Sequence, residues 1–145
     1  VQNNKTIRKA SLDDLNQIYL IEKDVFSNEH WTLEMVESEL ENFLRTTTWI
    51  IEESTVILGY CMLRIVCNEA NIINMAIKSS RQREGLGSLL LGYVLNQLPI
   101  NSSAFLEVKE GNLSAIKLYK RLGFNVINLR KNYYKDGRTA LIMHL

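Results

Sequence analysis

"SSRQREGLGSLL", residues 79–90, places a polar segment with two glycines directly before an apolar, helix-forming run. A strand-like segment precedes it, so the local order is strand, loop and helix. The N–H groups that begin a helix have no intrahelical partner and carry positive potential, and glycines let an anion approach the backbone. With Gly85 and Gly87 beside Arg81 and Arg83, the stretch predicts a phosphate cradle. A flexible loop with solvated charges explains it equally well.

Two common phosphate-binding loops do not match this stretch. A Walker loop requires Gly-Lys followed by Ser or Thr, and the sequence has none. A dinucleotide-binding loop requires a third glycine, where Leu90 stands, and begins directly after its strand. Here residues 79–84 separate the strand from the glycines. Both alternatives therefore rank behind a different kind of phosphate site.

Length and composition predict one α/β domain spanning residues 1–145. The chain is 46% hydrophobic and 23% charged, which is typical of a globular protein. No apolar run approaches the roughly 20 residues of a membrane helix, and the polar first ten residues lack the apolar centre of a signal peptide. We therefore expect a cytoplasmic protein that does not bind membranes.

The net charge of +1 argues against general nucleic-acid binding, but the charge is unevenly distributed. Residues 1–72 hold 6 Lys or Arg against 12 Asp or Glu, whereas residues 73–145 hold 11 against 4. This asymmetry suits an anionic ligand for the second half and a basic partner for the first. Folding that interleaves the two halves would remove the asymmetry, and the sequence leaves both possibilities open.

The cysteines and histidines predict neither a disulfide nor a metal site. Cys61 and Cys67 fall on one expected strand, where six residues span roughly 20 Å, against the ~7 Å between Cα atoms that a disulfide tolerates. Reduced cysteines agree with a cytoplasmic protein. His30 and His144 lie far apart, with no Cys or carboxylate at ligand spacing.

Hydrophobic periodicity predicts the element order βααβββαβαββ, a single mixed sheet with helices. Ser11 with Asp14, Thr32 and Asn112 are expected helix caps, and Gly123 is an expected helix end. The expected strands are 5–10, 46–53, 56–67, 69–78, 103–110, 124–134 and 138–145. The expected helices are 11–26, 33–42, 85–98 and 112–122.

Together the loop and a downstream segment resemble one enzyme family. "QREGLG" (82–87) matches the Q/R-x-x-G-x-G/A signature of the GNAT acetyltransferases, whose element order is also the one expected here. "LEVKEGNLSAIKLYKRLGF" (106–124) closely resembles the corresponding segment of ribosomal-protein-alanine N-acetyltransferases of the RimI type, as do "HW" (30–31) and "NYYKDGRTALIMHL" (132–145). Relatives often have His-Pro at Ser79 and Ser80.

The resemblance implies that acetyl-coenzyme A (acetyl-CoA) is the co-substrate and that no metal is needed. The backbone amides of the loop would hold its pyrophosphate, and the end of the preceding strand would pair with its pantetheine arm. The implied contacts are Met75, Ala76, Ile77, Gln82, Arg83, Glu84, Gly85, Leu86, Gly87, Ser88 and Asn112. Without the resemblance, Met75, Ala76 and Ile77 are equally compatible with simple packing.

Two residues receive catalytic roles from the same resemblance. Glu107 would act as general base and Tyr119 as general acid toward the leaving thiolate. Strand alternation places Glu107 on one face with Phe105 and Lys109. Taken alone, Glu107 could be an ordinary strand glutamate paired with a lysine, and Tyr119 an ordinary core aromatic.

The expected activity is direct acetyl transfer to the N-terminal amine of a protein. The resemblance implies the N-terminal alanine of a small-subunit ribosomal protein, held by Tyr133 and Tyr134 on one side and by His30 and Trp31 on the other. The alternatives are an acetyltransferase acting on a small-molecule amine and a non-catalytic CoA-binding module. The sequence does not give the oligomeric state.

Overall fold

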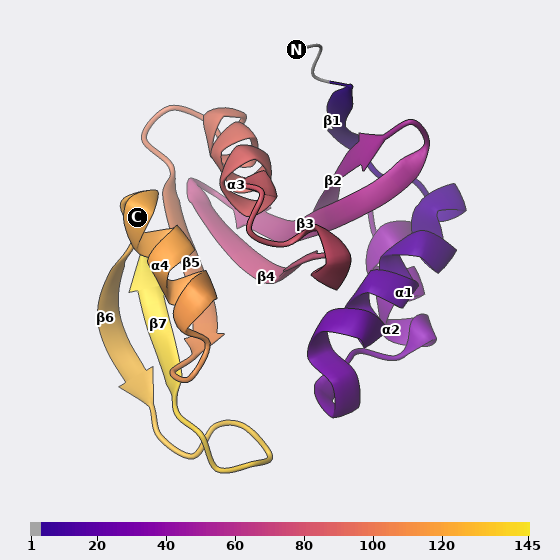
Figure 1. The fold of residues 1–145 in the computed structure, drawn as a ribbon. Coiled ribbons are helices and arrows are strands. Elements are labelled where there is room, and N and C mark those ends of the chain that lie inside the picture. The colour runs from indigo at the N-terminus through magenta and orange to yellow at the C-terminus, as the bar shows by residue number, and fades with distance from the viewer. Residues whose placement is uncertain (1–3) are drawn as a thin grey trace.

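A mixed sheet in the order β1-β2-β3-β4-β5-β7-β6 runs through the computed structural model, which describes residues 4–145 (Figure 1). Residues 1–3 of the expected domain, at the start of its polar N-terminal segment, lie outside the described residues. Among the described strands, only β4 and β5 pair in parallel. The strands are β1 (Lys5–Lys9), β2 (Thr46–Glu53), β3 (Val56–Val66), β4 (Glu69–Ile77), β5 (Ser103–Lys109), β6 (Asn125–Arg130) and β7 (Ala140–His144).

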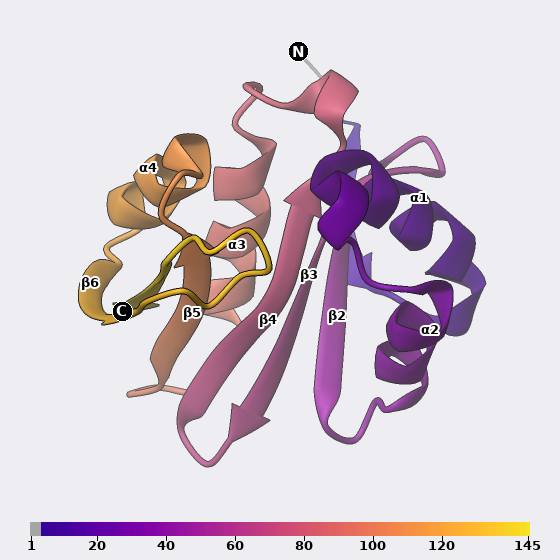
Figure 2. The same ribbon diagram turned by 90° about the horizontal axis from the view of Figure 1, so that it is seen from below.

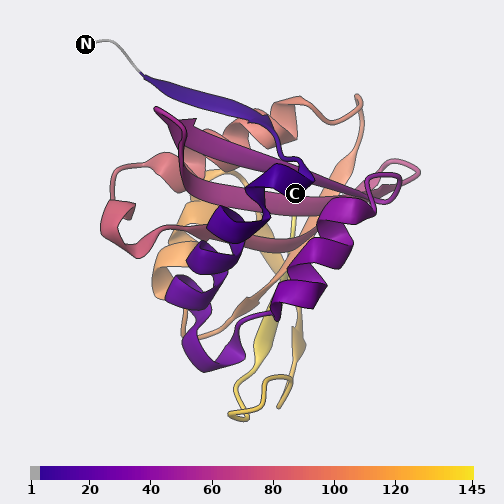
Figure 3. The same cartoon turned by 90° about the vertical axis from the view of Figure 1, so that its right-hand side faces the viewer.

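Helices cover both faces of the sheet (Figure 3). The pair α1 (Leu15–Phe26) and α2 (Leu33–Glu41) packs on one face, and the pair α3 (Leu86–Asn96) and α4 (Leu113–Arg121) packs on the other. Short 3-10 turns lie at Leu12–Asp14, Ser27–Glu29 and Ser79–Arg81. The buried core is accordingly divided into two clusters, which we call the α1/α2 cluster and the α3/α4 cluster. Ile18, Val36 and Tyr60 belong to the first, and Leu90, Leu106 and Phe124 to the second.

The sheet opens between β4 and β5 (Figure 2). These strands pair only where Glu69–Ile72 meets Ser103–Leu106. A register shift against β3 pairs Ile72 with Leu63 and Asn74 with Met62, so Ile73 is an extra, bulged residue. A bulge bends its strand and increases the local twist. The remaining part of β4 therefore diverges from β5 and leaves a V-shaped opening, called the split below.

The expected element order βααβββαβαββ is confirmed, and so are the expected helix caps and end. Thr32 Oγ1 accepts a hydrogen bond from the Met35 N–H at 3.2 Å, and Asn112 Oδ1 accepts one from the Ala115 N–H at 3.3 Å. Gly123 follows α4 with φ at +103°. None of the helices in residues 4–145 is long and apolar enough to cross a membrane.

Several expected boundaries are wrong, two of them at the ends of β6 and β3. The strand expected over 124–134 ends at Arg130, and residues 131–139 form a loop rather than a tight turn around "KDG". Charged residues and Gly137, at φ +84°, favour solvent over further pairing there. Cys67 lies in the β3–β4 turn with φ at +56°, rather than on the strand with Cys61. Both cysteines are free thiols, Cys61 buried and Cys67 exposed.

The first helical turn is fixed to the sheet by a carboxylate. Both Asp14 oxygens accept hydrogen bonds from the Arg8 guanidinium at 2.9 Å, and the Ser11 N–H donates to Asp14 at 2.8 Å. The hydrogen bonds from Arg8 hold the pKa of the Asp14 carboxyl below its ordinary value. A carboxyl with a lowered pKa stabilises the fold above its unfolded pKa, about 3.9, and loses that contribution as the pH falls.

Asp14→Asn should lower the free energy of unfolding by about 1 kcal/mol at pH 7, because the pair with Arg8 is partly exposed. The difference from wild type should shrink below pH ~4, where the wild-type carboxyl is also protonated. Urea unfolding at pH 7 and at pH 3 measures this difference in the free energy of unfolding. Asp13→Asn, at an exposed neighbouring position, is the control. An equal loss at pH 7 and at pH 3 would contradict the ionic origin.

Candidate active site

After Ile72, the backbone N–H and C=O groups of β4 that face β5 are not paired with it. The Lys78 N–H donates to Leu58 O in β3 at 2.8 Å, and N–H groups along a strand alternate in direction. The N–H groups of Ile77 and Met75 therefore point away from β3, into the split. Gln82 Nε2 donates to Ile77 O at 3.0 Å on that same side. An extended molecule in the split could add to this strand as a further strand would.

The loop after β4 delivers a helix N-terminus to the same region. Gly85 begins α3 in the left-handed region, with φ at +78° and no side-chain cap. The first intrahelical bond runs from the Leu89 N–H to Gly85 O, at 3.1 Å. The N–H groups of Leu86, Gly87 and Ser88 consequently have no acceptor within the helix, which suits an anion. The Leu86 side chain itself is buried in the core.

Gly87 permits close packing behind this turn. A Cβ at Gly87 would lie 2.9 Å from Leu118 Cδ2 of α4, and 3.8 Å from Met75 Cε of β4. The glycine therefore eases the approach of the first turn of α3 to α4, whereas toward the strand an added Cβ would make only an ordinary van der Waals contact. Asn112, which caps α4, stands at the N-terminus of that second helix.

Arg81 is not a free cation. Its guanidinium pairs with Glu84 at 2.9 Å and with Glu53 at 3.2 Å. The hydrogen bonds from Arg81 lower the pKa of the Glu84 carboxyl. Arg83 is exposed and adopts a positive φ of +67°, unusual for a residue with a side chain. Of the two arginines expected to supply cationic donors, Arg83 is the one whose side chain is exposed at the loop surface.

Glu107 lies on the β5 face that points away from α3 and α4. Its side chain is 33% exposed and pairs with Arg130 of β6, Oε1 to Nη1, at 3.2 Å. It lines a cavity of about 360 Å³ together with Asn71, Phe105 and Ile142. An exposed ion pair of this kind contributes little stability and is easily replaced by another partner. The carboxylate is thus reachable from solvent.

Tyr119 lies on the opposite side of β5. It belongs to the α3/α4 cluster, is 9% exposed and stacks edge-on against Phe124 with ring centroids 6.0 Å apart. Burial raises the pKa of the Tyr119 phenol above its ordinary value. The phenol therefore keeps its proton at neutral pH and can act as a donor.

The two segments expected to hold an acceptor meet at Lys109. Its ammonium pairs with Glu29 at 2.9 Å and with Asp136 at 2.7 Å, and lies 5.1 Å from the ring of Tyr134. Glu29 directly precedes His30, and Asp136 belongs to the loop after β6. The α1–α2 loop and the β6–β7 loop are consequently joined across the end of β5.

The four expected acceptor residues occupy these two loops. The rings of Tyr133 and Tyr134 pack edge to face with centroids 5.2 Å apart, and Tyr133 also lies 5.6 Å from the Arg130 guanidinium. The His30 ring packs 5.9 Å from that of Tyr19. The Trp31 N–H donates to Glu22 of α1 at 2.7 Å.

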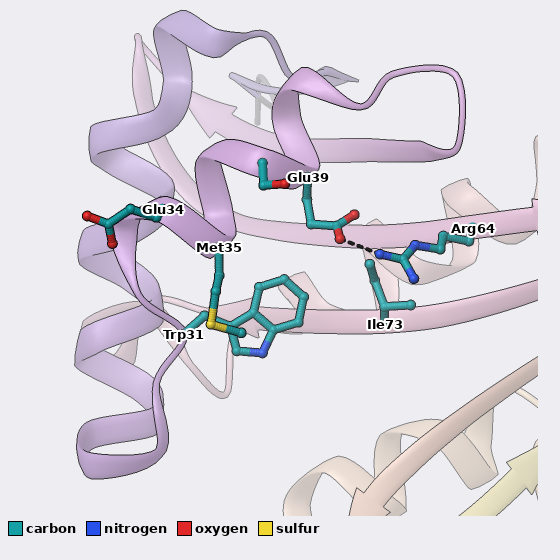
Figure 4. Close-up of a pocket in the computed structure, with 7 residues that line it drawn as sticks. Trp31, Glu34, Met35, Glu39, Arg64 and Ile73 are labelled. Atoms are coloured by element: carbon teal, nitrogen blue, oxygen red, sulfur yellow. Dashed lines mark hydrogen bonds and ion pairs between the residues drawn. The ribbon is translucent and has the colours of Figure 1, made fainter.

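A second cavity of about 480 Å³ begins at Trp31 (Figure 4). Trp31, Met35 of α2 and Ile73 of β4 give it an apolar wall, and Glu39 pairs with Arg64 at its edge. Ile73 also lines the cavity of Glu107. The two cavities therefore adjoin at the bulged residue of β4, on the α1/α2 face.

Sequence reasoning missed several residues that shape this region. Strand alternation places Lys109 beside Glu107, but its partners Glu29 and Asp136 come from distant loops that alternation does not locate. Arg130 carries no local signal that pairs it with Glu107. Among residues 4–145, no group of three or more His, Cys, Asp or Glu side chains could hold a metal ion.

Comparisons with known proteins agree with this geometry. Residues 12–124 match the family model described as acetyltransferase (GNAT) family. The [ribosomal protein bS18]-alanine N-acetyltransferase of Escherichia coli K12 is 32% identical over 145 residues, covering 97% of this chain and 96% of that protein. The crystal structure of the ribosomal-protein-S18-alanine N-acetyltransferase from Escherichia coli superposes with a TM-score of 0.88 at 31% identity, covering 97% and 92% of the two chains. Ard1 from Thermoplasma volcanium gives 0.88 at 26% identity, covering 99% and 97%.

Two glycine substitutions in α3 should have opposite effects. Gly85→Ala places a side chain at φ +78° and should lower the free energy of unfolding by about 1 kcal/mol through strain alone, because nothing lies within 4 Å of the added Cβ. Gly92→Ala, in the helix interior with its nearest atom at 4.0 Å, should raise it by about 0.5–1 kcal/mol. Denaturant melts measure both. If Gly85→Ala leaves the free energy of unfolding unchanged, the left-handed conformation at this position is not required.

Proposed function

This chain belongs to the GNAT acetyltransferase family, and we propose that it transfers acetyl from acetyl-CoA to the N-terminal amine of a protein. The observation that carries the proposal is the split. It brings the edge of β4 that β5 leaves unpaired, the uncapped N-terminus of α3 and the Glu107 carboxylate to one opening. The acceptor that fits best is the N-terminal alanine of a small-subunit ribosomal protein, and such a protein is met in the cytoplasm.

The residues present fit acetyl-CoA. The N–H groups of residues 86–88 suit a pyrophosphate, and Gly85 offers no Cβ to obstruct it. Met75 and Ile77 offer the split a strand edge for the amide groups of a pantetheine arm, with Ala76 buried between them. Gln82, Arg83, Glu84 and Asn112 border this path. When bound, acetyl-CoA supplies the activated acetyl group.

Each catalytic step then has a residue in this chain. Glu107 accepts a proton from the incoming ammonium, directly or through a water, and leaves a neutral amine to attack. The Met75 N–H faces the split, where a carbonyl oxygen gaining negative charge would be stabilised. Tyr119 donates its proton to the departing sulfur, and the second proton that the amine nitrogen loses on forming the amide restores the phenol through solvent. Neither Cys61, buried with a pKa raised to about 12, nor the distant Cys67 is needed for a covalent intermediate.

A single carboxylate can deprotonate an N-terminal amine more easily than it can deprotonate a lysine side chain. Its pKa is ~8 against ~10.4 for lysine, so neutralising it costs about 3 kcal/mol less at a given pH. The adjoining cavities carry Glu34 and Glu39 in one, and Glu69 and Glu107 in the other. Arg64 pairs with Glu39 and Arg130 with Glu107, so each cavity keeps one carboxylate in excess, which favours a positively charged polypeptide.

Comparing kcat/KM on three acceptors tests the proposal. An alanine-first basic peptide should be acetylated far faster than the same peptide with a blocked N-terminus and a free lysine, or than a polyamine. Preference for the polyamine would support the small-amine alternative. Tight acetyl-CoA binding without transfer to any acceptor would support a non-catalytic binding module.

Glu107→Gln should reduce kcat by about 100-fold or more, because a positioned general base contributes roughly 10² to 10⁴. Acetyl-CoA affinity, measured by calorimetry, should change little. Glu110→Gln, on the exposed loop that follows β5, is the matched control and should retain activity. Parallel loss of turnover and of acetyl-CoA affinity would assign Glu107 a structural role instead.

Tyr119→Phe should lower kcat by about 10-fold or more, since it removes the proton that the leaving sulfur takes up. Because burial raises the pKa of Tyr119, the wild-type rate should not decline near pH 10 through loss of this proton. A pH–rate profile for both proteins measures this. A wild-type decline below pH 10 that is absent from Tyr119→Phe would contradict the raised pKa.

A further inference from the structure

A buried carboxylate that the proposed mechanism does not use lies beneath the split. Glu22 of α1 is 1% exposed and accepts hydrogen bonds from three donors. These are the Tyr60 hydroxyl of β3, Asn74 Nδ2 of β4 at 2.5 Å and the Trp31 N–H at 2.7 Å. Removing a carboxylate from water is costly unless its oxygens are fully satisfied. So many donors from separate elements indicate a residue that fixes their relative positions.

Asn74 extends this network to the edge of the split. Its Nδ2 donates to Glu22, and its Oδ1 accepts from the Met75 N–H at 3.0 Å. Since a carboxylate can only accept and a backbone N–H can only donate, these two partners fix the orientation of the amide group. The bulge at Ile73 makes this contact possible, because it turns Asn74 to the α1 side of the sheet.

The network therefore reaches both substrates of the proposed reaction. One branch ends at the Met75 N–H, which the mechanism uses to stabilise the thioester carbonyl. The other ends at Trp31, in the loop that lines the acceptor cavity. Glu22 itself cannot act as a base toward an amine, because it is inaccessible and both of its oxygens are engaged.

We propose that Glu22 and Asn74 are positioning residues for acetyl transfer. Asn74 Oδ1 holds the Met75 N–H aimed into the split until the thioester oxygen takes its place, and Glu22 anchors Asn74 and Trp31 in register with each other. This inference rests on the proposed function. A purely structural role for the same bonds would affect stability and speed exchange of the Met75 amide in Asn74→Ala, but it would not lower kcat in the folded enzyme.

The first test is hydrogen exchange in the protein without ligands. Asn74→Ala should accelerate exchange of the Met75 amide, which loses its acceptor, and leave that of Lys78, bonded to β3, unchanged. In the wild type, the Met75 amide chemical shift should differ between the CoA and acetyl-CoA complexes, because only the latter has a thioester carbonyl. Unchanged Met75 exchange in Asn74→Ala, or identical shifts in the two complexes, would overturn the proposal.

The second test is kinetic. Asn74→Ala should lower kcat on an alanine-first peptide by about 100-fold, the loss expected of a small misplacement, with acetyl-CoA affinity nearly unchanged. Glu22→Gln, which keeps the size but accepts through one oxygen, should lower kcat and also raise KM for the peptide. Glu41→Gln, exposed at the end of α2, is the matched control.

The outcomes separate this inference from the proposed function. A wild-type protein that transfers no acetyl to the peptide refutes the proposed function, whatever the variants do. A wild-type protein that transfers acetyl, with Asn74→Ala equally fast, refutes only the positioning role. If Glu22→Gln does not fold, as thermal melts would show, Asn74→Ala still decides, because it leaves the bonds from Trp31 and Tyr60 to Glu22 in place.

Discussion

The extra residue in β4 is the constraint on which the remaining architecture depends. Because Ile73 has no partner in β3, β4 bends away from β5 after only four paired residues, Glu69–Ile72. Unused backbone N–H groups in a sheet interior normally cost free energy. Here they border an opening that an extended ligand could fill. The same bulge turns Asn74 toward Glu22, so one irregularity creates both the binding edge and the network that supports it.

The two faces of the sheet provide different environments. The α3/α4 face is apolar and closely packed, with Gly87 leaving room for Leu118 of α4, and burial there keeps the phenol of Tyr119 protonated. The α1/α2 face is open near Glu107, where the cavity lining includes polar and charged residues as well as apolar ones. In the proposed reaction the proton acceptor and the proton donor are thus separated by the sheet, and they can serve the same substrate only at the split.

The sequence predicts local features of the fold and fails where distant segments meet. Alternation and capping residues located the elements because Thr32, Asn112 and Gly123 act on their own helices. The strand expected through residues 131–134 was wrong because the N–H groups of Tyr133 and Tyr134 both donate to Arg138 O within the loop rather than to a neighbouring strand. The partners of Glu107 and Lys109 are set by tertiary contacts, and no spacing rule encodes them.

In the candidate site, too, local features are predictable from the sequence, whereas contacts between distant segments are not. Gly85 and the helix after it are a local signal, so the uncapped turn that we propose binds an anion could be predicted before the fold was known. Arg81 looked like part of that signal, but Glu53, from a different strand, neutralises it. Glu22 gave no signal at all, since an isolated glutamate on a helix is ordinarily solvated. Its proposed role follows only from its burial against Tyr60, Asn74 and Trp31. The most informative polar residue here is therefore one that is buried although its side chain is charged.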